Sequence, residues 1–360
     1  MHITDERIQS LREKMKEYRM DAYLVPTADF HESEYVGEHF KCRKYLTGFT
    51  GSAGTAVITM EDACLWVDGR YFVQSAAELK GSCVKMMKMG QEGVPSVQEY
   101  LEEHVPEGGC LGFDGRVVNS LTGLSLEKNL REKGARIICT EDLVGMIWQD
   151  RPELSSEPAW ILEERYAGKS AADKIADVRA AMKKVHATVH VLTTLDDIAW
   201  LLNIRGNDIA YNPVVLSYVI VTEDKLYLFV NEKVLHGEAY PYMDNYHNID
   251  MLKYLEDLGT EILPYDDIYK MATDITGHKI LMEKQHINYA LYNVLKDKNE
   301  LVDKMNPTSD AKAVKNAVEI ENEKKAHIKD GVAVTRFIYW LKHHIGKERL
   351  TELGVQVGGQ

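Results

Sequence analysis

Residues 57–68 have the sequence VITMEDACLWVD, and residues 219–230 have the sequence VIVTEDKLYLFV. Each stretch consists of two apolar runs on either side of an acidic turn, a pattern typical of a buried β-hairpin. An aromatic-Leu turn precedes each hairpin, at Tyr45–Gly48 and at Trp200–Asn203. Two matching segments in one chain indicate an internal duplication. The alternative is a pair of unrelated domains that share a common hairpin.

Helical and extended patterns alternate around the first hairpin. Ile8, Leu11 and Met15 recur at helical spacing and predict a helix that begins at Thr4 or Asp5. The other segments predicted in this half are strands at 21–26, 54–60, 63–68, 110–114 and 135–140, and helices at 71–79, 94–105 and 121–133. This alternation predicts an α/β domain at residues 1–156.

The second half repeats this plan after a linker at 151–158 (RPELSSEP). The predicted elements are a helix at 171–184 and strands at 188–193, 214–222 and 225–230, which place a second α/β domain at residues 157–308. A third segment, residues 309–360, has a helical pattern, and Asp330–Gly331 indicates a bend or a functional loosening within it. Its apolar residues are expected on roughly one face: Val314, Val318, Ile328, Val332, Phe337, Ile338 and Leu341.

Composition is ordinary for a globular protein, with 45% hydrophobic and 28% charged residues among 360. The net charge of -13 argues against general affinity for nucleic acid or anionic membrane, since both favour excess Lys and Arg. Five scattered cysteines without a C-x-x-C pair suit reduced thiols in a cytosolic protein. The polar start of the chain does not resemble a signal peptide, and no apolar run is long enough to span a bilayer.

Histidine spacing gives only weak indications of a metal site. His186 and His190 are four residues apart, but the predicted helix should end before Thr188, so they should not share a face. His343–His344 points in two directions on a helix, and we expect exposure to solvent. The segment His31–Glu34 is polar enough to bind a cation, although one such cluster is weak evidence.

A glycine-rich segment, Gly48–Gly54 (GFTGSAG), resembles a phosphate-binding loop superficially. It lacks the Gly-Lys-Ser/Thr ending, and a strand follows it where a helix N-terminus would be needed. It is not a G-x-S-x-G nucleophile motif, because Thr50 stands two residues before Ser52. Tight backbone turns are the simplest use of these glycines.

The segment 68–72 (DGRYF) is the strongest local candidate for a binding site. Arg70 follows a strand and a glycine at the start of a helix, so its guanidinium could hold a carbonyl or carboxylate through paired donors. The alternative is an ion pair with a nearby acid such as Asp68. The same two interpretations apply in the second half to Asp196, Asp197 and Arg205.

Three long strings resemble one known family, the three-domain cytosolic Xaa-Pro aminopeptidases of metallopeptidase family M24. They are 51–74 (GSAGTAVITMEDACLWVDGRYFVQ), 195–206 (LDDIAWLLNIRG) and 326–330 (AHIKD). The resemblance covers nearly the whole chain in order. It implies two tandem creatinase N-terminal-type domains with a ribonuclease H-like α/β fold, followed at 309–360 by the start of a pita-bread catalytic domain.

The resemblance also implies an activity. This family removes an N-terminal residue that precedes proline, using two divalent metal ions, usually manganese, held by two Asp, one His and two Glu. The similarity ends at Leu353, before any of those ligands. We therefore expect a truncated chain that has no catalytic residue, binds no metal itself and is inactive alone.

Arg70 matches the family arginine that reaches from the first domain to the substrate, so we predict a substrate-binding role for it. The implied partners are short peptides with proline at position two, and the implied location is the cytoplasm. A homodimer is a further expectation, because uncovered apolar residues of the third segment could drive self-association. Two alternatives stay open: a non-catalytic peptide-binding or protein-binding module of the same fold, and the creatinase or prolidase branches. The latter normally have one N-terminal domain, so the duplication argues against them.

Overall fold

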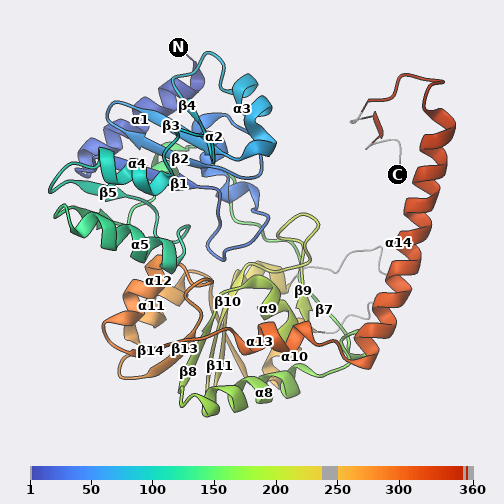
Figure 1. Cartoon of the computed structure of the whole chain (residues 1–360). Coiled ribbons are helices and arrows are strands. Elements are labelled where there is room, and N and C mark those ends of the chain that lie inside the picture. Colours follow the sequence, from blue (N-terminus) through green and yellow to red (C-terminus); the bar gives the residue numbers. More distant parts are fainter. Residues whose placement is uncertain (1, 237–249, 352–353, 356–360) are drawn as a thin grey trace.

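The computed structural model describes residues 2–236, 250–351 and 354–355. Two α/β domains follow one another along the chain, and a long helix begins beside the second domain and extends away from it (Figure 1). The predicted fold class, two tandem α/β domains, is confirmed.

The first domain is built on a mixed sheet with the strand order β4-β3-β2-β1-β5-β6. β2 is antiparallel to both of its neighbours, whereas the other neighbouring pairs are parallel. The strands are β1 (Ala22–Pro26), β2 (Thr55–Thr59), β3 (Ala63–Val67), β4 (Lys85–Lys88), β5 (Cys110–Gly112) and β6 (Arg136–Ile138).

Helices cover both faces of this sheet, so alternate strand residues enter two separate cores. Tyr23 and Val25 pack with Ile8 of the first helix, and Leu24 packs on the other face with Leu126. The helices are α1 (Ile3–Glu17), η1 (Glu38–Phe40), α2 (Cys42–Thr47), η2 (Gly69–Tyr71), α3 (Phe72–Glu78), α4 (Val97–His104), α5 (Ser120–Arg131) and α6 (Leu143–Ile147).

The second domain has the same topology, with the strand order β12-β11-β10-β8-β13-β14. Its strands are β8 (Val189–Leu192), β10 (Ser217–Thr222), β11 (Leu226–Val230), β12 (Thr260–Pro264), β13 (Lys279–Met282) and β14 (Glu300–Asp303). A separate two-stranded sheet pairs β7 (Trp160–Ile161) with β9 (Ile204–Arg205).

Helices of the second domain also pack on both faces of the sheet. One core includes Ile175 and Val178, and the other includes Ile268 and Leu291. The helices are α7 (Glu164–Ala167), α8 (Ala171–Lys184), α9 (Leu195–Leu201), η3 (Glu232–Leu235), α10 (Met251–Asp257), α11 (Asp267–Asp274) and α12 (Tyr289–Lys296).

The duplication extends to a cation that holds the end of a short helix. In the first domain the Arg7 guanidinium lies 4.1 Å from the centre of the Tyr45 ring and donates to the Tyr45 carbonyl. In the second domain the Lys174 ammonium lies 4.1 Å from the Trp200 ring and donates to the Trp200 carbonyl. The alternative of two unrelated domains is therefore wrong.

The residue that ends each of these turns has left-handed backbone geometry. Gly48 has φ of +74° and Asn203 has φ of +51°. Glycine adopts this region without steric cost, and asparagine tolerates it better than most residues. The prediction that the segment Gly48–Gly54 serves tight backbone turns is confirmed at Gly48.

The two domains pack through equivalent helices, α5 and α12. Asn119 caps α5 by accepting a hydrogen bond from Thr122 N–H, and Asn288 caps α12 by accepting one from Leu291 N–H. These two asparagines face each other in an isolated antiparallel bridge.

Backbone hydrogen bonds on either side of this bridge are reciprocal. Ser120 N–H donates to the Ile287 carbonyl at 2.9 Å, and Tyr289 N–H donates to the Val118 carbonyl at 2.7 Å. Each donor is the first residue after a capping asparagine, and each acceptor is the residue before one. The contact therefore has the geometry of a two-fold symmetric interface within a single chain.

A long loop of the first domain, residues 27–41, enters the second domain. Phe30 and Phe40 belong to a core of the second domain. His31 is buried, with Nδ1 2.8 Å from the Thr193 carbonyl and Nε2 2.6 Å from the Tyr265 hydroxyl. A carbonyl only accepts, so Nδ1 carries the hydrogen, and burial lowers the pKa of His31. His31 thus links the two domains.

The third segment begins with α13 (Pro307–Ala313), which packs on α9. Its docking centres on buried Asp197, which accepts hydrogen bonds from Thr194 and Ser309 and lies 2.9 Å from the Lys312 ammonium. Lys312 also pairs with Asp196. The sequence left open whether Asp196 and Asp197 bind a ligand or form local ion pairs. In this structure both form local contacts that dock α13.

α14 (Ala317–His344) follows and has no buried residue among those described. Its first turns contact α7, where Asn316 donates to the Ala167 carbonyl and Asn322 to the Arg165 carbonyl. The expectation that Val314 shares a face of this helix was wrong, because Val314 lies between α13 and α14. The helix is continuous through Gly331, where a bend or a functional loosening was expected. None of the described helices is long and apolar enough to cross a bilayer.

Candidate functional site

Arg70 lies on a tight turn at the carboxyl end of β3. Asp68 caps this turn by accepting from the Arg70 backbone N–H at 3.0 Å. The same carboxylate also accepts from Arg70 Nε at 2.9 Å and from Nη2 at 2.8 Å. These hydrogen bonds lower the pKa of Asp68 to about 2 and raise that of Arg70.

This contact is the ion pair that the sequence offered as the alternative to substrate binding. The pairing does not use every donor of Arg70. The side chain is 68% exposed, and Nη1 has no hydrogen-bond partner among the described residues. The guanidinium also lies 5.1 Å from the centre of the Tyr71 ring. Asp68 and Tyr71 thus orient the Arg70 guanidinium, whose outer N–H donors still face solvent.

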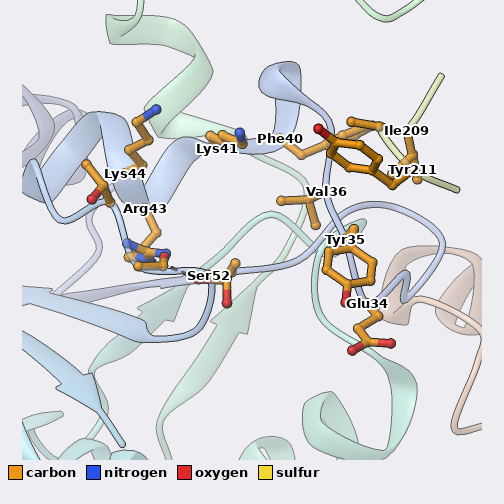
Figure 2. A pocket seen from close by; sticks show the side chains of 14 residues that line it. Glu34, Tyr35, Val36, Phe40, Lys41, Arg43, Lys44, Ser52, Ile209 and Tyr211 are labelled. Atoms are coloured by element: carbon orange, nitrogen blue, oxygen red, sulfur yellow. Dashed lines mark hydrogen bonds between the residues drawn. The ribbon is translucent and has the colours of Figure 1, made fainter. Parts of the chain in front are cut away.

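A cavity of about 250 Å³ lies between the first domain and residues 209–211 of the second, and Arg70 is not among the residues that line it. Figure 2 shows Arg43 and Ser52 on one side of it, with Tyr35 and Tyr211 on the other. Ser52 Oγ lies 2.7 Å from the hydroxyl of Tyr71, so the wall of the cavity connects directly to the Arg70 turn.

Arg43, on α2, fixes the glycine-rich wall of this cavity. Its guanidinium donates to Thr27 Oγ1 at 2.9 Å and to the carbonyls of Phe49 and Gly51. Arg43 is 3% exposed and forms no ion pair with a described carboxylate, so burial lowers its pKa to about 10. Sequence gave no signal for this role, because the acceptors are two backbone carbonyls and a hydroxyl.

The glycine-rich segment is also tied to the helix that follows Arg70. Glu78, on α3, accepts from Thr50 N–H at 2.8 Å and from Thr50 Oγ1 at 2.6 Å. Gln74 donates to Thr50 Oγ1 at 2.9 Å. Arg43, the glycine-rich segment and α3 therefore form one hydrogen-bonded support beneath the Arg70 turn.

The histidines considered from sequence do not assemble a metal centre. His186 lies past the end of α8, whereas His190 is buried in β8 with Nδ1 2.9 Å from the Leu281 carbonyl, so the prediction that they do not share a face is confirmed. His343 and His344 lie near the end of α14, each bonded to a carbonyl four residues earlier. Within 2–236, 250–351 and 354–355, no three His, Cys, Asp or Glu side chains are grouped as a metal site would require.

Arg205, left between two interpretations with the two aspartates, also has local partners. Its Nη1 donates to the carbonyls of Ala199 at 2.6 Å and Ile204 at 2.9 Å. Arg70 is therefore a sequence candidate whose outer donors face solvent, on a turn that the Ser52–Tyr71 hydrogen bond connects to the wall of the cavity.

Two family profiles match the chain, at residues 7–147 and at residues 150–319. Both describe the creatinase/prolidase N-terminal domain. Each domain belongs to that family. The two halves of the chain thus share both their strand order and their family.

Curated relatives match nearly all of this chain within longer chains of their own. A probable Xaa-Pro aminopeptidase P of Sordaria macrospora is 36% identical over 97% of this chain and 57% of its own length. Xaa-Pro aminopeptidase 1 of Dictyostelium discoideum is 36% identical over 94% of this chain and 53% of its own length. The chain therefore spans somewhat more than half the length of these relatives.

A solved structure agrees over the whole chain. The X-prolyl aminopeptidase of Caenorhabditis elegans, described as a cytosolic enzyme with a di-nuclear active site, superposes with a TM-score of 0.89 at 28% identity. The match covers 100% of this chain and 59% of the other. The described residues here do not fit a pair of metal ions, because they bring no suitable ligand group together, and we assign no metal-dependent step to them.

Proposed function

We propose that this chain forms the two N-terminal domains and the first catalytic-domain helices of a cytosolic Xaa-Pro aminopeptidase. In this proposal the domains limit access to short peptides with proline at position two, and Arg70 binds the peptide. The full enzyme would use two divalent metal ions, usually manganese, held by residues outside the described part of this chain.

The observation that carries the proposal is the state of Arg70. Its side chain is 68% exposed and fixed by Asp68, with outer donors directed away from the pair. A preset guanidinium loses little side-chain entropy when it binds a carbonyl or carboxylate. The family match over both domains, with the Arg70 turn inside the matched range 7–147, supports a peptide as the ligand.

Because the described residues hold no metal-ligand group, we expect no hydrolysis by the chain itself. The test is to incubate the purified chain with the peptide Arg-Pro-Pro and manganese, and to measure released arginine. Turnover that scales with the concentration of the chain would refute this part of the proposal.

The role of Arg70 is tested separately by calorimetric titration of the chain with Arg-Pro-Pro. We expect weak but measurable binding that falls about fivefold to tenfold in Arg70→Ala, since one charge-assisted contact contributes about 1 to 1.5 kcal/mol. Arg70→Lys should retain part of the affinity, because a lysine keeps the charge but loses the fork.

Arg131→Ala is the matched control. Arg131 is an exposed arginine on α5, 76% exposed and paired with Glu127, away from the cavity. Its loss should leave peptide binding unchanged. Equal effects of the Arg70 and Arg131 substitutions would mean that only overall charge matters, and no binding by the chain at millimolar peptide would contradict the role of Arg70.

A further inference from the structure

A second cavity, of about 530 Å³, lies at the carboxyl ends of β1 and β5 in the first domain. Pro26 ends β1, and Val118 and Asn119 follow β5 just before α5 begins. Open α/β sheets commonly bind ligands in the crevice outside these strand ends. The walls are mostly apolar, and Glu32 is the one ionisable side chain among the described residues that line the cavity.

The equivalent crevice of the second domain is already filled. There Thr193 directly follows β8 and Asn288 caps the start of α12. The Phe30 carbonyl accepts from Asn288 Nδ2 at 3.0 Å, and His31 Nδ1 donates to the Thr193 carbonyl at 2.8 Å. A two-residue segment of the first domain thus occupies the crevice of the second.

The difference between the two crevices follows from one pair of equivalent positions. Thr59 and Thr222 begin the matching hairpin turns, so Thr55 and Tyr218, each four residues earlier, correspond. Tyr218 is fully buried, and the centre of its ring lies 4.4 Å from that of His31. Thr55 is much smaller than tyrosine and lines an open cavity.

Glu32 lies between the two crevices and turns back into the open one. Its φ of +58° reverses the chain immediately after His31. Oε2 accepts from Asn119 Nδ2 at 3.2 Å, and no basic side chain among the described residues lies within ion-pair distance. Burial raises the pKa of Glu32 to about 7, as expected for a carboxylate without a counter-charge.

We propose that this crevice binds a small molecule or peptide end that carries a primary ammonium group and an aromatic side chain. The ammonium would lie against Glu32, which supplies a charge that the protein leaves unpaired. The aromatic group would pack on the apolar wall, as Phe30 does in the filled crevice. This site is separate from the Arg70 turn, and its test does not depend on the proposed function.

The probe is L-phenylalanine amide, which has the amine and the ring but no carboxylate. Its matched partner is N-acetyl-L-phenylalanine amide, which lacks the positive charge. Binding is followed by methyl NMR of the full chain, with the methyls of Leu24, Val118 and Leu126 as reporters of the cavity. We expect the amide to shift these methyls and to bind at least tenfold more tightly than its acetylated partner.

Two substitutions and one control test the assignment. Glu32→Gln should weaken binding about tenfold and remove the preference for the free amine. Thr55→Tyr introduces the residue of the second domain and should abolish binding by filling the cavity. Glu34→Gln, which removes a carboxylate of the same loop that lines the other cavity, should leave the affinity unchanged.

Methyl signals remote from the cavity report whether each variant keeps the native fold. If Thr55→Tyr fails to fold, the comparison of Glu32→Gln with Glu34→Gln still decides the question. The proposal is overturned if neither probe binds at millimolar concentration. It is also overturned if both probes bind equally, if the shifts fall outside the cavity, or if Glu34→Gln weakens binding as much as Glu32→Gln.

Discussion

Glu32 combines a left-handed backbone, partial burial and a missing counter-charge, and each affects the free energy of unfolding. Its pKa is raised from 4.5 to about 7, first by burial and then by the nearby Asp29 charge, against a hydrogen bond from Asn119 that lowers it. The folded state therefore holds a proton more tightly than the unfolded chain. The resulting stabilisation is complete below about pH 4.5 and is lost as the pH rises to about 7.

Glu32→Gln should remove this pH dependence, because a glutamine does not ionise. We expect the variant to be more stable than the natural chain by about 1 to 3 kcal/mol at pH 8, and the difference to shrink toward pH 5. Urea unfolding of both proteins at several pH values measures this difference in the free energy of unfolding. A stability difference that does not change with pH would contradict the raised pKa.

Arg43 is the residue whose loss should most disturb the support of the Arg70 turn. Arg43→Ala would leave the Phe49 and Gly51 carbonyls without their buried donor, at a cost of about 2 to 4 kcal/mol in the free energy of unfolding. Arg43→Lys should cost less, although a single ammonium cannot reach every acceptor. Urea unfolding followed by circular dichroism gives both values.

Arg179→Ala is the control for Arg43. Arg179 also donates to two backbone carbonyls, those of Thr222 and Lys225, but it lies at the surface. Water can replace it there, so we expect a loss below about 1 kcal/mol. If Arg179→Ala cost as much as Arg43→Ala, burial would not be the cause of the Arg43 effect.

At the scale of elements, sequence patterns predicted most of the fold. The hairpins β2–β3 and β10–β11 were predicted to within three residues at each end, because continuous apolar runs on either side of a T-x-E-D or T-E-D turn mark both strands. The helix at 171–184 was predicted with the bounds of α8. These elements are determined by local chemistry.

The interface between the domains could not be predicted in the same way. Asn119 and Asn288 each look like an ordinary helix cap in sequence, and their pairing depends on contacts between distant segments. The hydrogen bonds of Arg43 could not be predicted for a similar reason, because every residue has a backbone carbonyl and the sequence does not show which ones Arg43 reaches. Arg70 could be singled out from sequence because its DGRYF motif is local, and its role as a substrate contact stays a prediction.

The helix α14 is continuous through Gly331, where the sequence indicated a bend or a functional loosening. A glycine within an exposed helix costs about 1 kcal/mol relative to alanine, which one residue in a helix of 28 can tolerate. A Cβ at Gly331 would meet nothing within 4 Å. We expect Gly331→Ala to increase helix content and to stabilise α14 locally by about 0.5 to 1 kcal/mol.

The measurement is circular dichroism at 222 nm during thermal unfolding, with hydrogen exchange of the α14 amides. Ala333→Gly, two residues away on the same exposed helix, serves as the opposite control and should reduce protection by a similar amount. Lower helix content in Gly331→Ala would indicate that the glycine has a function that the exposed helix does not reveal.

For the whole molecule, the reciprocal contact of α5 and α12 predicts cooperative unfolding of both domains. Ser120 occupies the first position of α5, where proline is tolerated because its missing N–H has no partner within the helix. Here that N–H donates across the interface to Ile287. Ser120→Pro should therefore weaken the interface while leaving the helix intact.

We expect one calorimetric transition for the natural chain, with equal calorimetric and van't Hoff enthalpies for the two-domain body. Ser120→Pro should lower stability by about 1 to 3 kcal/mol more than Ser120→Ala, which loses only the hydroxyl bond to the Lys284 carbonyl. Equal effects of the two substitutions would show that the backbone hydrogen bond does not couple the domains.

The two-fold contact of Asn119 and Asn288 has a consequence for how such a pair of domains can change over time. In an assembly of identical subunits, every substitution occurs on both sides of the axis at once. Joining the halves in one polypeptide removes that restriction, so one half can keep its crevice open while its loop fills the crevice of the other. A single covalent chain thereby permits a division of labour that a symmetric pair of separate subunits could not maintain.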